Sequence, residues 1–322
     1  MEKDKKEILV TGGAGFIGSH LVEKLLAGNY AVTAIDNFDP FYNKSVKLNN
    51  MSSFKDHPSF TFIEMDILNE AELNNKLTGN YEAIIHLAAK AGVRPSIMNP
   101  VAYQDVNVKG TQNLLEFAKN KSIKQFVFSS SSSVYGINKN FPWKESDAVL
   151  NPISPYASTK ISGELLGHVY SHLFNIRFIA LRFFTVYGPR QRPDLAIHLF
   201  SKKIMNDQPI QFFGNGSTRR DYTYVSDTVQ GIYNALHYTR TPYEVFNLGN
   251  HHTVSLSEMI ETIETVFKKK AIIEQLPEQM GDVPITYADI SKAQQLLNYI
   301  PKTDFKTGVE HFREWLIGNR QS

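Results

Sequence analysis

Tyr156 and Lys160 are the two residues whose types and spacing point most directly to catalysis. Side chains four positions apart lie on one face of a helix, so the phenol and the ammonium can be neighbours. A free tyrosine has a pKa of about 10 and is a poor base at neutral pH, but a nearby positive charge favours the phenolate. Such a phenol can take a proton from a substrate hydroxyl while hydride leaves the same carbon. The alternative is an ordinary exposed Tyr/Lys pair, because this spacing is common by chance.

The residues around this pair predict the helix that carries it. Ser154 suits the N-cap and Pro155 suits the first helical position, so we expect a helix over 156–173. A run of serines at 129–133 follows an apolar stretch and ends it with hydroxyl groups. A serine-rich strand end before a Tyr/Lys helix favours the catalytic interpretation of the pair.

A glycine cluster near the start of the chain predicts a dinucleotide site. The apolar run 8–11 leads into Gly12, Gly13, Gly15 and Gly18, which match both the G-x-G-x-x-G and the G-x-x-G-x-x-G spacing. Glycine is needed there because a Cβ would block the turn, the pyrophosphate or close helix–strand packing. The helix that follows presents free N–H groups and the positive end of its dipole to a diphosphate.

An acidic residue at the end of the next strand indicates which dinucleotide is bound. Asp36 closes the apolar run 31–36 and lies 18 residues after Gly18, where an acid binds the adenosine ribose of NAD. A 2′-phosphate beside Asp36 would be repelled, so NAD is preferred to NADP. The alternative is a glycine-rich turn followed by a surface aspartate. Bound NAD would also bring a positive nicotinamide ring, which favours a tyrosine phenolate.

Composition excludes several classes of protein. The 322 residues suffice for a large core and one or two domains, and 42% of them are hydrophobic. A net charge of +2 gives no field that would indicate nucleic acid or an anionic membrane. There is no cysteine, which rules out disulfides and thiolate chemistry. No apolar run is long enough to span a membrane, and the charged first residues do not resemble a signal peptide, so we expect a cytoplasmic protein.

Strand-like and helical patterns alternate through the first half of the chain, for example around a helical stretch at 101–119. This alternation predicts an α/β fold of the Rossmann type, a doubly wound parallel sheet with helices on both faces. Ligands then bind beyond the carboxyl ends of the strands, where Asp66, Ala88, Ala89 and the serine run should lie. The expected strands are 8–11, 31–36, 60–65, 82–88, 124–129 and 176–183.

The pattern becomes less regular after Gly188, which suggests a boundary. We expect residues 1–188 to form the NAD-binding domain, with 225–250 partly returning to it, and 189–322 to form mostly a smaller substrate-binding lobe. No flexible linker separates the two, so the cleft between them should be fairly rigid. The elements expected in this second part are helices near 195–206, 255–268 and 305–317 and a strand at 244–249.

Together these motifs resemble the extended short-chain dehydrogenase/reductase family, specifically its nucleotide-sugar epimerases. The resemblance covers nearly the whole chain. Besides the glycine stretch 11–18 and the Tyr156/Lys160 pair, it is carried by His86-Leu87-Ala88-Ala89, Asn107-Val108-Lys109-Gly110-Thr111, the segment 129–136, Arg220-Asp221-Tyr222 and Gly281-Asp282.

The resemblance implies a set of site residues. Ser131 becomes the catalytic hydroxyl that bridges the sugar and Tyr156, beside Lys160. The expected NAD site comprises Gly12, Gly15, Phe16, Ile17, Gly18, Asp36, Asn37, Asp66, Ile67, Leu87, Ala88, Ala89, Lys90, Asn107, Tyr156 and Lys160. The expected UDP-sugar site comprises Ser131, Ser132, Ser133, Thr185, Arg192, Gln211, Arg220 and Asp282. No metal is expected, because the pair His251-His252 has no third ligand nearby.

A few positions separate neighbouring activities within this group. Sugar 4,6-dehydratases carry Asp-Glu where Ser132 and Ser133 stand, and nucleotide-uronate decarboxylases usually carry Glu at the position of Ser133. Galactose-type epimerases usually carry Asn in the segment that here contains Thr185. The absence of both acids argues against the dehydratase and the decarboxylase, and Thr185 argues against an epimerase of neutral hexoses.

The loop 184–194 and the segment 281–284 look like those of UDP-glucuronate 4-epimerases. A guanidinium on a loop at the cleft matches a carboxylate bidentately, so we expect Arg192 to bind the uronate carboxylate with help from Thr185. A solvated surface pair or a diphosphate clamp remains the alternative for Arg190 and Arg192.

The expected reaction is NAD-dependent 4-epimerisation of a UDP-sugar, in the first place UDP-glucuronate to UDP-galacturonate through a transient 4-keto sugar. The alternatives are a 4-epimerase of UDP-glucose or UDP-N-acetylglucosamine, a UDP-glucuronate decarboxylase, and a non-catalytic NAD-binding regulator. The family usually forms a homodimer through helices that correspond to 101–119 and 156–173. Core packing would account for the same apolar faces.

Overall fold

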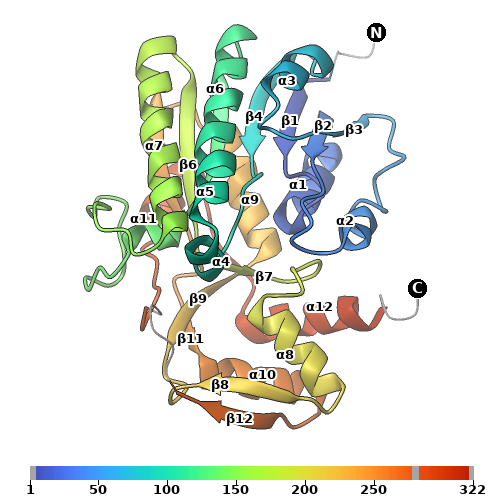
Figure 1. The fold of residues 1–322 in the computed structure, drawn as a ribbon, viewed down its shortest axis with the longest axis vertical. Helices are drawn as coiled ribbons and strands as arrows, with labels where there is room; N and C mark the ends of the chain where they lie inside the picture. Colours follow the sequence, from blue (N-terminus) through green and yellow to red (C-terminus); the bar gives the residue numbers. More distant parts are fainter. Residues whose placement is uncertain (1–4, 278–282, 319–322) are drawn as a thin grey trace.

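A twisted parallel sheet with helices on both faces forms the upper part of the molecule (Figure 1). The structure is a computed structural model that describes residues 5–277 and 283–318. Among these residues the sheet has seven strands in the order β10-β6-β5-β4-β1-β2-β3, every neighbouring pair being parallel. The strands are β1 (Glu7–Thr11), β2 (Ala31–Asp36), β3 (Phe60–Glu64), β4 (Tyr81–His86), β5 (Gln125–Ser131), β6 (Arg177–Phe183) and β10 (Tyr243–Leu248).

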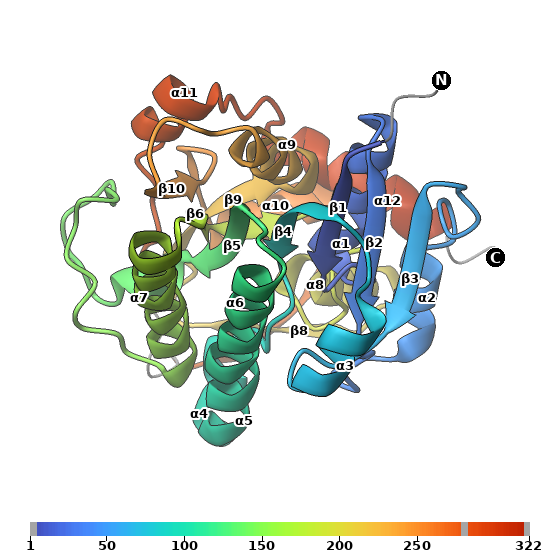
Figure 2. The same ribbon diagram turned by 90° about the horizontal axis from the view of Figure 1, so that it is seen from above.

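The apolar runs are buried because side chains of each strand alternate between two cores. In β1, Ile8 and Val10 pack with Leu21 on one face, whereas Leu9 packs with Leu114 on the other. Helices α1 (Phe16–Ala27) and α9 (Val225–Leu236) cover the first face. Helices α3 (Glu70–Lys76), α6 (Gly110–Asn120) and α7 (Pro155–Phe174) cover the second, as Figure 2 shows from above. The predicted Rossmann-type fold is therefore confirmed.

The helix expected at 101–119 is interrupted. It runs as α5 (Pro100–Gln104), a π-helical segment η1 (Asp105–Lys109) and then α6. Single π-turns inside helices often occur at functional sites. This turn carries Asn107, whose amide bonds both backbone groups of Lys90 and the hydroxyl of Thr159. The apolar spacing of 101–119 gave no sign of the interruption, because the helix continues in the same direction.

The second part of the molecule lies below the carboxyl ends of the sheet (Figure 1). It contains a three-stranded sheet in the order β11-β9-β7 and a pair of strands, β12 and β8. The strands are β7 (Thr185–Tyr187), β8 (Pro209–Phe213), β9 (Arg219–Tyr224), β11 (Thr253–Ser255) and β12 (Ile272–Leu276). Helices α8 (Ala196–Met205), α10 (Leu256–Phe267) and α12 (Phe305–Gly318) pack around them.

The remaining helices are short. They are α2 (Lys44–Asn50), α4 (Val93–Met98), α11 (Ser291–Leu297) and a 3₁₀ turn η2 (Ser132–Tyr135). Strand β10 and helix α9 come late in the chain but join the first part, since β10 pairs with β6 and α9 packs against α1. No helix in the described ranges has the length and apolar character that a membrane span requires.

Candidate active site

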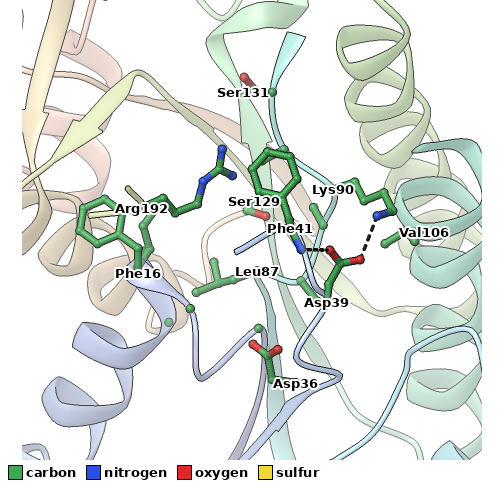
Figure 3. Close-up of a pocket in the computed structure, with 18 of the residues that line it drawn as sticks. Phe16, Asp36, Asp39, Phe41, Leu87, Lys90, Val106, Ser129, Ser131 and Arg192 are labelled. Atoms are coloured by element: carbon green, nitrogen blue, oxygen red, sulfur yellow. Dashed lines mark hydrogen bonds and ion pairs between the residues drawn. The ribbon is translucent and has the colours of Figure 1, made fainter. Parts of the chain in front are cut away.

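A cavity of about 500 Å³ opens at the carboxyl ends of β1, β2, β4 and β5 (Figure 3). This is the edge of a parallel sheet at which ligands are expected to bind. All the residues predicted for the dinucleotide line this cavity except Asn107, which lies behind it and holds the backbone of Lys90. Of the residues predicted for the sugar, Ser131, Thr185 and Arg192 line the cavity.

The glycine turn forms a cradle that side chains would fill. Gly12 has φ +71°, and a Cβ there would lie 2.9 Å from the backbone nitrogen of Ala88. A Cβ on Gly18 would lie 2.1 Å from the carbonyl oxygen of Gly12. The N-cap of α1 is Gly15, which offers no side chain to the first N–H groups of the helix. The turn therefore fits a diphosphate seated on the helix N-terminus.

The acid at the end of β2 has a buried partner. The carboxylate of Asp36 accepts hydrogen bonds from the backbone N–H of Phe38 at 2.9 Å and from Lys47 Nζ at 3.0 Å. Both side chains of this ion pair are buried. Lys47 lines the cavity but was not predicted, because nothing in the sequence relates it to Asp36 before α2 folds back on β2. Nearby, Asn37 donates to Asp66 at 2.8 Å, so two residues predicted to line the NAD site fix each other.

The predicted catalytic residues come together at one end of the cavity. Ser131 ends β5, and Tyr156 lies in the first turn of α7, where Ser154 caps the helix by accepting from the Ala157 N–H. Lys160 Nζ donates to the carbonyl oxygen of Ser129 at 2.8 Å and lies 5.8 Å from the centre of the Tyr156 ring. The N-cap and helix predicted for this segment are confirmed.

The pKa of the phenol depends on burial and on two neighbouring side chains. Burial raises the pKa of Tyr156, while a hydrogen bond with Ser131 and the positive charge of Arg192 oppose the increase. Burial also lowers the pKa of Lys160 to about 7, and the nearby charge of Glu164 opposes that decrease. The expectation that Lys160 and the nicotinamide ring of bound NAD together favour the phenolate stays a prediction; Lys160 itself is desolvated and donates to Ser129.

Of the three serines Ser131, Ser132 and Ser133 at the end of β5, only Ser131 lines the cavity. Ser131 Oγ accepts from the backbone N–H of Ser133 at 3.1 Å and donates to Ser133 Oγ, also at 3.1 Å. Ser132 and Ser133 begin the 3₁₀ turn η2 and lie outside the residues that line the cavity. Ser133 thus stands behind Ser131 and fixes its hydroxyl.

A buried ion pair supports this end of the sheet. Arg182 on β6 and Glu164 on α7 pair through two hydrogen bonds of 2.9 and 2.8 Å. Ser130 donates to the same carboxylate at 2.5 Å, and Arg182 also donates to the Tyr135 hydroxyl at 3.0 Å. Tyr135 in turn donates to Asn247 on β10 at 2.7 Å. The network ties α7, β5, β6 and β10 together directly behind Ser131.

Arg192 faces the catalytic residues from the loop before α8. Its Nε and Nη2 atoms donate to the two carboxylate oxygens of Asp194 at 3.0 and 2.7 Å. The ring of Phe41 lies against the guanidinium, 4.9 Å away. Arg190, by contrast, pairs with Glu23 of α1 at 3.0 and 2.7 Å and does not line the cavity. The two arginines of this loop therefore have different environments.

Two residues predicted for the sugar nucleotide lie elsewhere, and a third cannot be placed. Gln211 is exposed on β8, and Arg220 donates to the carbonyl oxygens of Arg219 and Val283, so neither lines the cavity. Asp282 lies outside the described residues. Within the described ranges no three His, Asp or Glu side chains group as metal ligands would. Sequence reasoning also missed Phe41, Tyr42 and Tyr103, which line the cavity and whose positions depend on loop conformation.

The comparisons with known proteins agree with this arrangement. The model of the GDP-mannose 4,6 dehydratase family matches residues 9–312. The chain belongs to this family. The predicted membership of the extended short-chain dehydrogenases/reductases is thereby confirmed. A UDP-glucuronate 4-epimerase from Thermodesulfobacterium geofontis is 41% identical to this chain and aligns over 95% of each chain.

Two crystal structures extend the comparison. UDP-glucuronic acid 4-epimerase from Bacillus cereus, in complex with UDP-glucuronic acid and NAD, is 39% identical with a TM-score of 0.91, covering 97% of this chain and 99% of its own. UDP-glucose 4-epimerase from Thermotoga maritima, with UDP-glucose, is 30% identical with a TM-score of 0.88, covering 98% and 99%.

Proposed function

We propose that the protein is an NAD-dependent UDP-glucuronate 4-epimerase that interconverts UDP-glucuronate and UDP-galacturonate. One observation carries the proposal: Ser131, Tyr156 and Lys160 share one cavity with Arg192, which brings a cation to the sugar end of a dinucleotide groove. The similarity to the Bacillus cereus epimerase that binds UDP-glucuronic acid and NAD supports the same substrate and cofactor.

The residues of the chain divide the chemistry between them. Bound NAD supplies the acceptor and donor of hydride at carbon 4 of the sugar. Tyr156 takes the proton from the 4-hydroxyl, with Ser131 bridging the two groups and the charge of Arg192 favouring the phenolate. The 4-keto sugar then turns about its phosphate linkage so that carbon 4 presents its opposite face for the return of hydride, and Tyr156 returns the proton to the 4-oxygen. Because no net oxidation occurs, the cofactor need not leave.

A uronate brings a hazard that the site must control. The 4-keto uronate is a β-keto acid and can lose carbon dioxide. A carboxylate whose orientation is fixed by Arg192 and Thr185 while carbon 4 is a ketone discourages that loss. Ser133 stands where related decarboxylases usually carry an acid. We therefore propose that Arg192 and Thr185 protect the intermediate as well as bind the substrate.

Parallel assays of two substrates test the proposed function. The holoenzyme is incubated with UDP-glucuronate and with UDP-glucose, and the 4-epimers and any UDP-pentose are resolved by chromatography. We expect rapid formation of UDP-galacturonate, little UDP-pentose and much slower turnover of UDP-glucose. Preferential conversion of UDP-glucose would favour the neutral-hexose alternative, which the similarity to the Thermotoga maritima enzyme also supports.

We further propose that two copies associate as a homodimer. Helices α7 and α4–α5 lie side by side on the outer face of the sheet (Figure 2). They expose large apolar side chains, namely Ile97, Met98, Val101, Leu165, Val169 and Leu173. Large exposed apolar side chains on neighbouring helices are typical of an interface. The cytoplasmic location expected from composition remains a prediction.

A further inference from the structure

The orientation of Arg192 is determined by two residues from different parts of the chain. Asp194 occupies one edge of the guanidinium through two hydrogen bonds of 3.0 and 2.7 Å. Phe41 lies against its face at 4.9 Å, within the range of a cation–π interaction. A guanidinium has five N–H groups, so these contacts leave donors on Nη1 for a ligand. In Figure 3 the guanidinium is directed toward the Ser131 end of the cavity.

The position of Phe41 is unusual for an apolar residue. Its side chain is 46% exposed and lies in the loop between β2 and α2, which belongs to the dinucleotide-binding half. The loop is held over the cavity by Asp39, whose carboxylate accepts from the Phe41 N–H at 3.0 Å and pairs with Lys90 at 2.8 Å. The ring is therefore fixed against Arg192 instead of being buried in a core.

These contacts define a role in substrate selection. We propose that Phe41 and Asp194 are specificity-determining positioning residues, which hold the Arg192 guanidinium so that its free edge captures the carboxylate of the sugar. The inference rests on the proposed function. Phe41 contacts the face of the guanidinium, and Asp194 binds its outer edge. The guanidinium is therefore oriented before the substrate binds. Pre-organisation of this kind increases affinity because less side-chain freedom is lost on binding.

Ligand binding in a catalytically silent background tests the role of Phe41. The holoenzyme carrying Tyr156→Phe is titrated calorimetrically with UDP-glucuronate and with UDP-glucose, with and without Phe41→Leu. Leucine keeps an apolar side chain but removes the aromatic face. We expect the Kd for UDP-glucuronate to rise about three- to tenfold, as loss of a partly exposed cation–π contact predicts, while the Kd for UDP-glucose stays unchanged. Phe41→Trp should restore the wild-type Kd, because tryptophan provides the best aromatic face.

The variant Asp194→Asn distinguishes two roles for Asp194, which can either orient the Arg192 guanidinium or compete with the substrate carboxylate for it. If Asp194 orients Arg192, the variant binds UDP-glucuronate more weakly and UDP-glucose as before. If Asp194 merely competes with the substrate carboxylate, the variant binds UDP-glucuronate more tightly, and the inference is overturned for this residue. Two matched controls should leave both Kd values unchanged. They are Phe141→Leu, another exposed ring, and Asp56→Asn, another exposed aspartate, neither of which lines the cavity.

Failure of this inference can be distinguished from failure of the proposed function. Wild-type protein that does not epimerise UDP-glucuronate contradicts the proposed function. Wild-type protein that does so, while Phe41→Leu binds UDP-glucuronate as tightly as its parent, contradicts only the role of Phe41. An equal loss of affinity for both ligands would indicate a general distortion of the cavity and would also overturn the assignment.

Discussion

At the scale of single residues, the pKa of Tyr156 is shifted in opposite directions by its surroundings. Burial raises its pKa, and Ser131 and Arg192 act in the opposite direction. The ammonium of Lys160 is itself desolvated and bonded to the backbone of Ser129. We therefore expect the phenolate to depend on several groups of the cavity together, including Arg192, Lys160 and the positive nicotinamide ring that bound NAD would add.

The first prediction concerns the phenol itself. Tyr156→Phe removes the only atom of this side chain that can take the proton, and we expect the turnover rate to fall by about 10²- to 10⁴-fold. NAD should remain bound, since the glycine turn and Asp36 are unchanged. Turnover is measured with UDP-glucuronate, and cofactor content is measured after the protein is denatured. Near-normal turnover would refute the assignment of the base.

The second prediction concerns the charge beside that phenol. Arg192→Met removes a positive charge that lowers the pKa of Tyr156, so the pKa should rise. Because the reaction needs the phenolate, the ascending limb of the pH–kcat profile should move to higher pH. Arg192→Lys keeps the charge and should leave the limb near its wild-type position, although it should bind the uronate less well. An unchanged limb in Arg192→Met would show that the two groups are not coupled.

At the scale of elements, the buried pair of Glu164 and Arg182 holds α7 against β6. Removing one partner from a buried ion pair leaves an uncompensated charge, which typically costs about 3–5 kcal/mol. We therefore expect Arg182→Met to lower the free energy of unfolding by about that amount. The double variant Glu164→Met/Arg182→Met should be destabilised less, because neither charge is left unpaired. Urea denaturation of both variants gives the comparison, and equal losses would show that the pairing is energetically unimportant.

Some elements and contacts of the structure could be predicted from the sequence, and others could not. Apolar runs with polar ends predicted the central strands, and the Ser154–Pro155 cap predicted the start of α7, because these signals are local. The glycine spacing likewise located the dinucleotide cradle. The pairs Asp36–Lys47 and Arg192–Phe41 could not be predicted, because each joins segments that meet only when loops fold. The π-turn at Asn107 was missed since its apolar pattern matches that of an α-helix.

At the scale of the whole molecule, the exposed face of α7 tests the proposed homodimer. Leu173 is 60% exposed near the end of this helix, and a glutamate there would place a charge in an apolar interface. We expect Leu173→Glu to sediment as a monomer and the wild-type protein as a dimer. Leu150→Glu, in the loop that precedes α7 and 82% exposed, serves as the matched control and should remain dimeric. A wild-type monomer would contradict the proposal.

The return of the chain to the first sheet has a further consequence. Strand β10 pairs with β6 and forms one edge of the sheet, although some 60 residues separate the end of β6 from the start of β10. A fragment cut off after residue 188 would leave the hydrogen-bonding groups of β6 unpaired along a buried, apolar strand. Such bare edges recruit other chains, so the fragment should aggregate instead of folding as an independent nucleotide-binding unit.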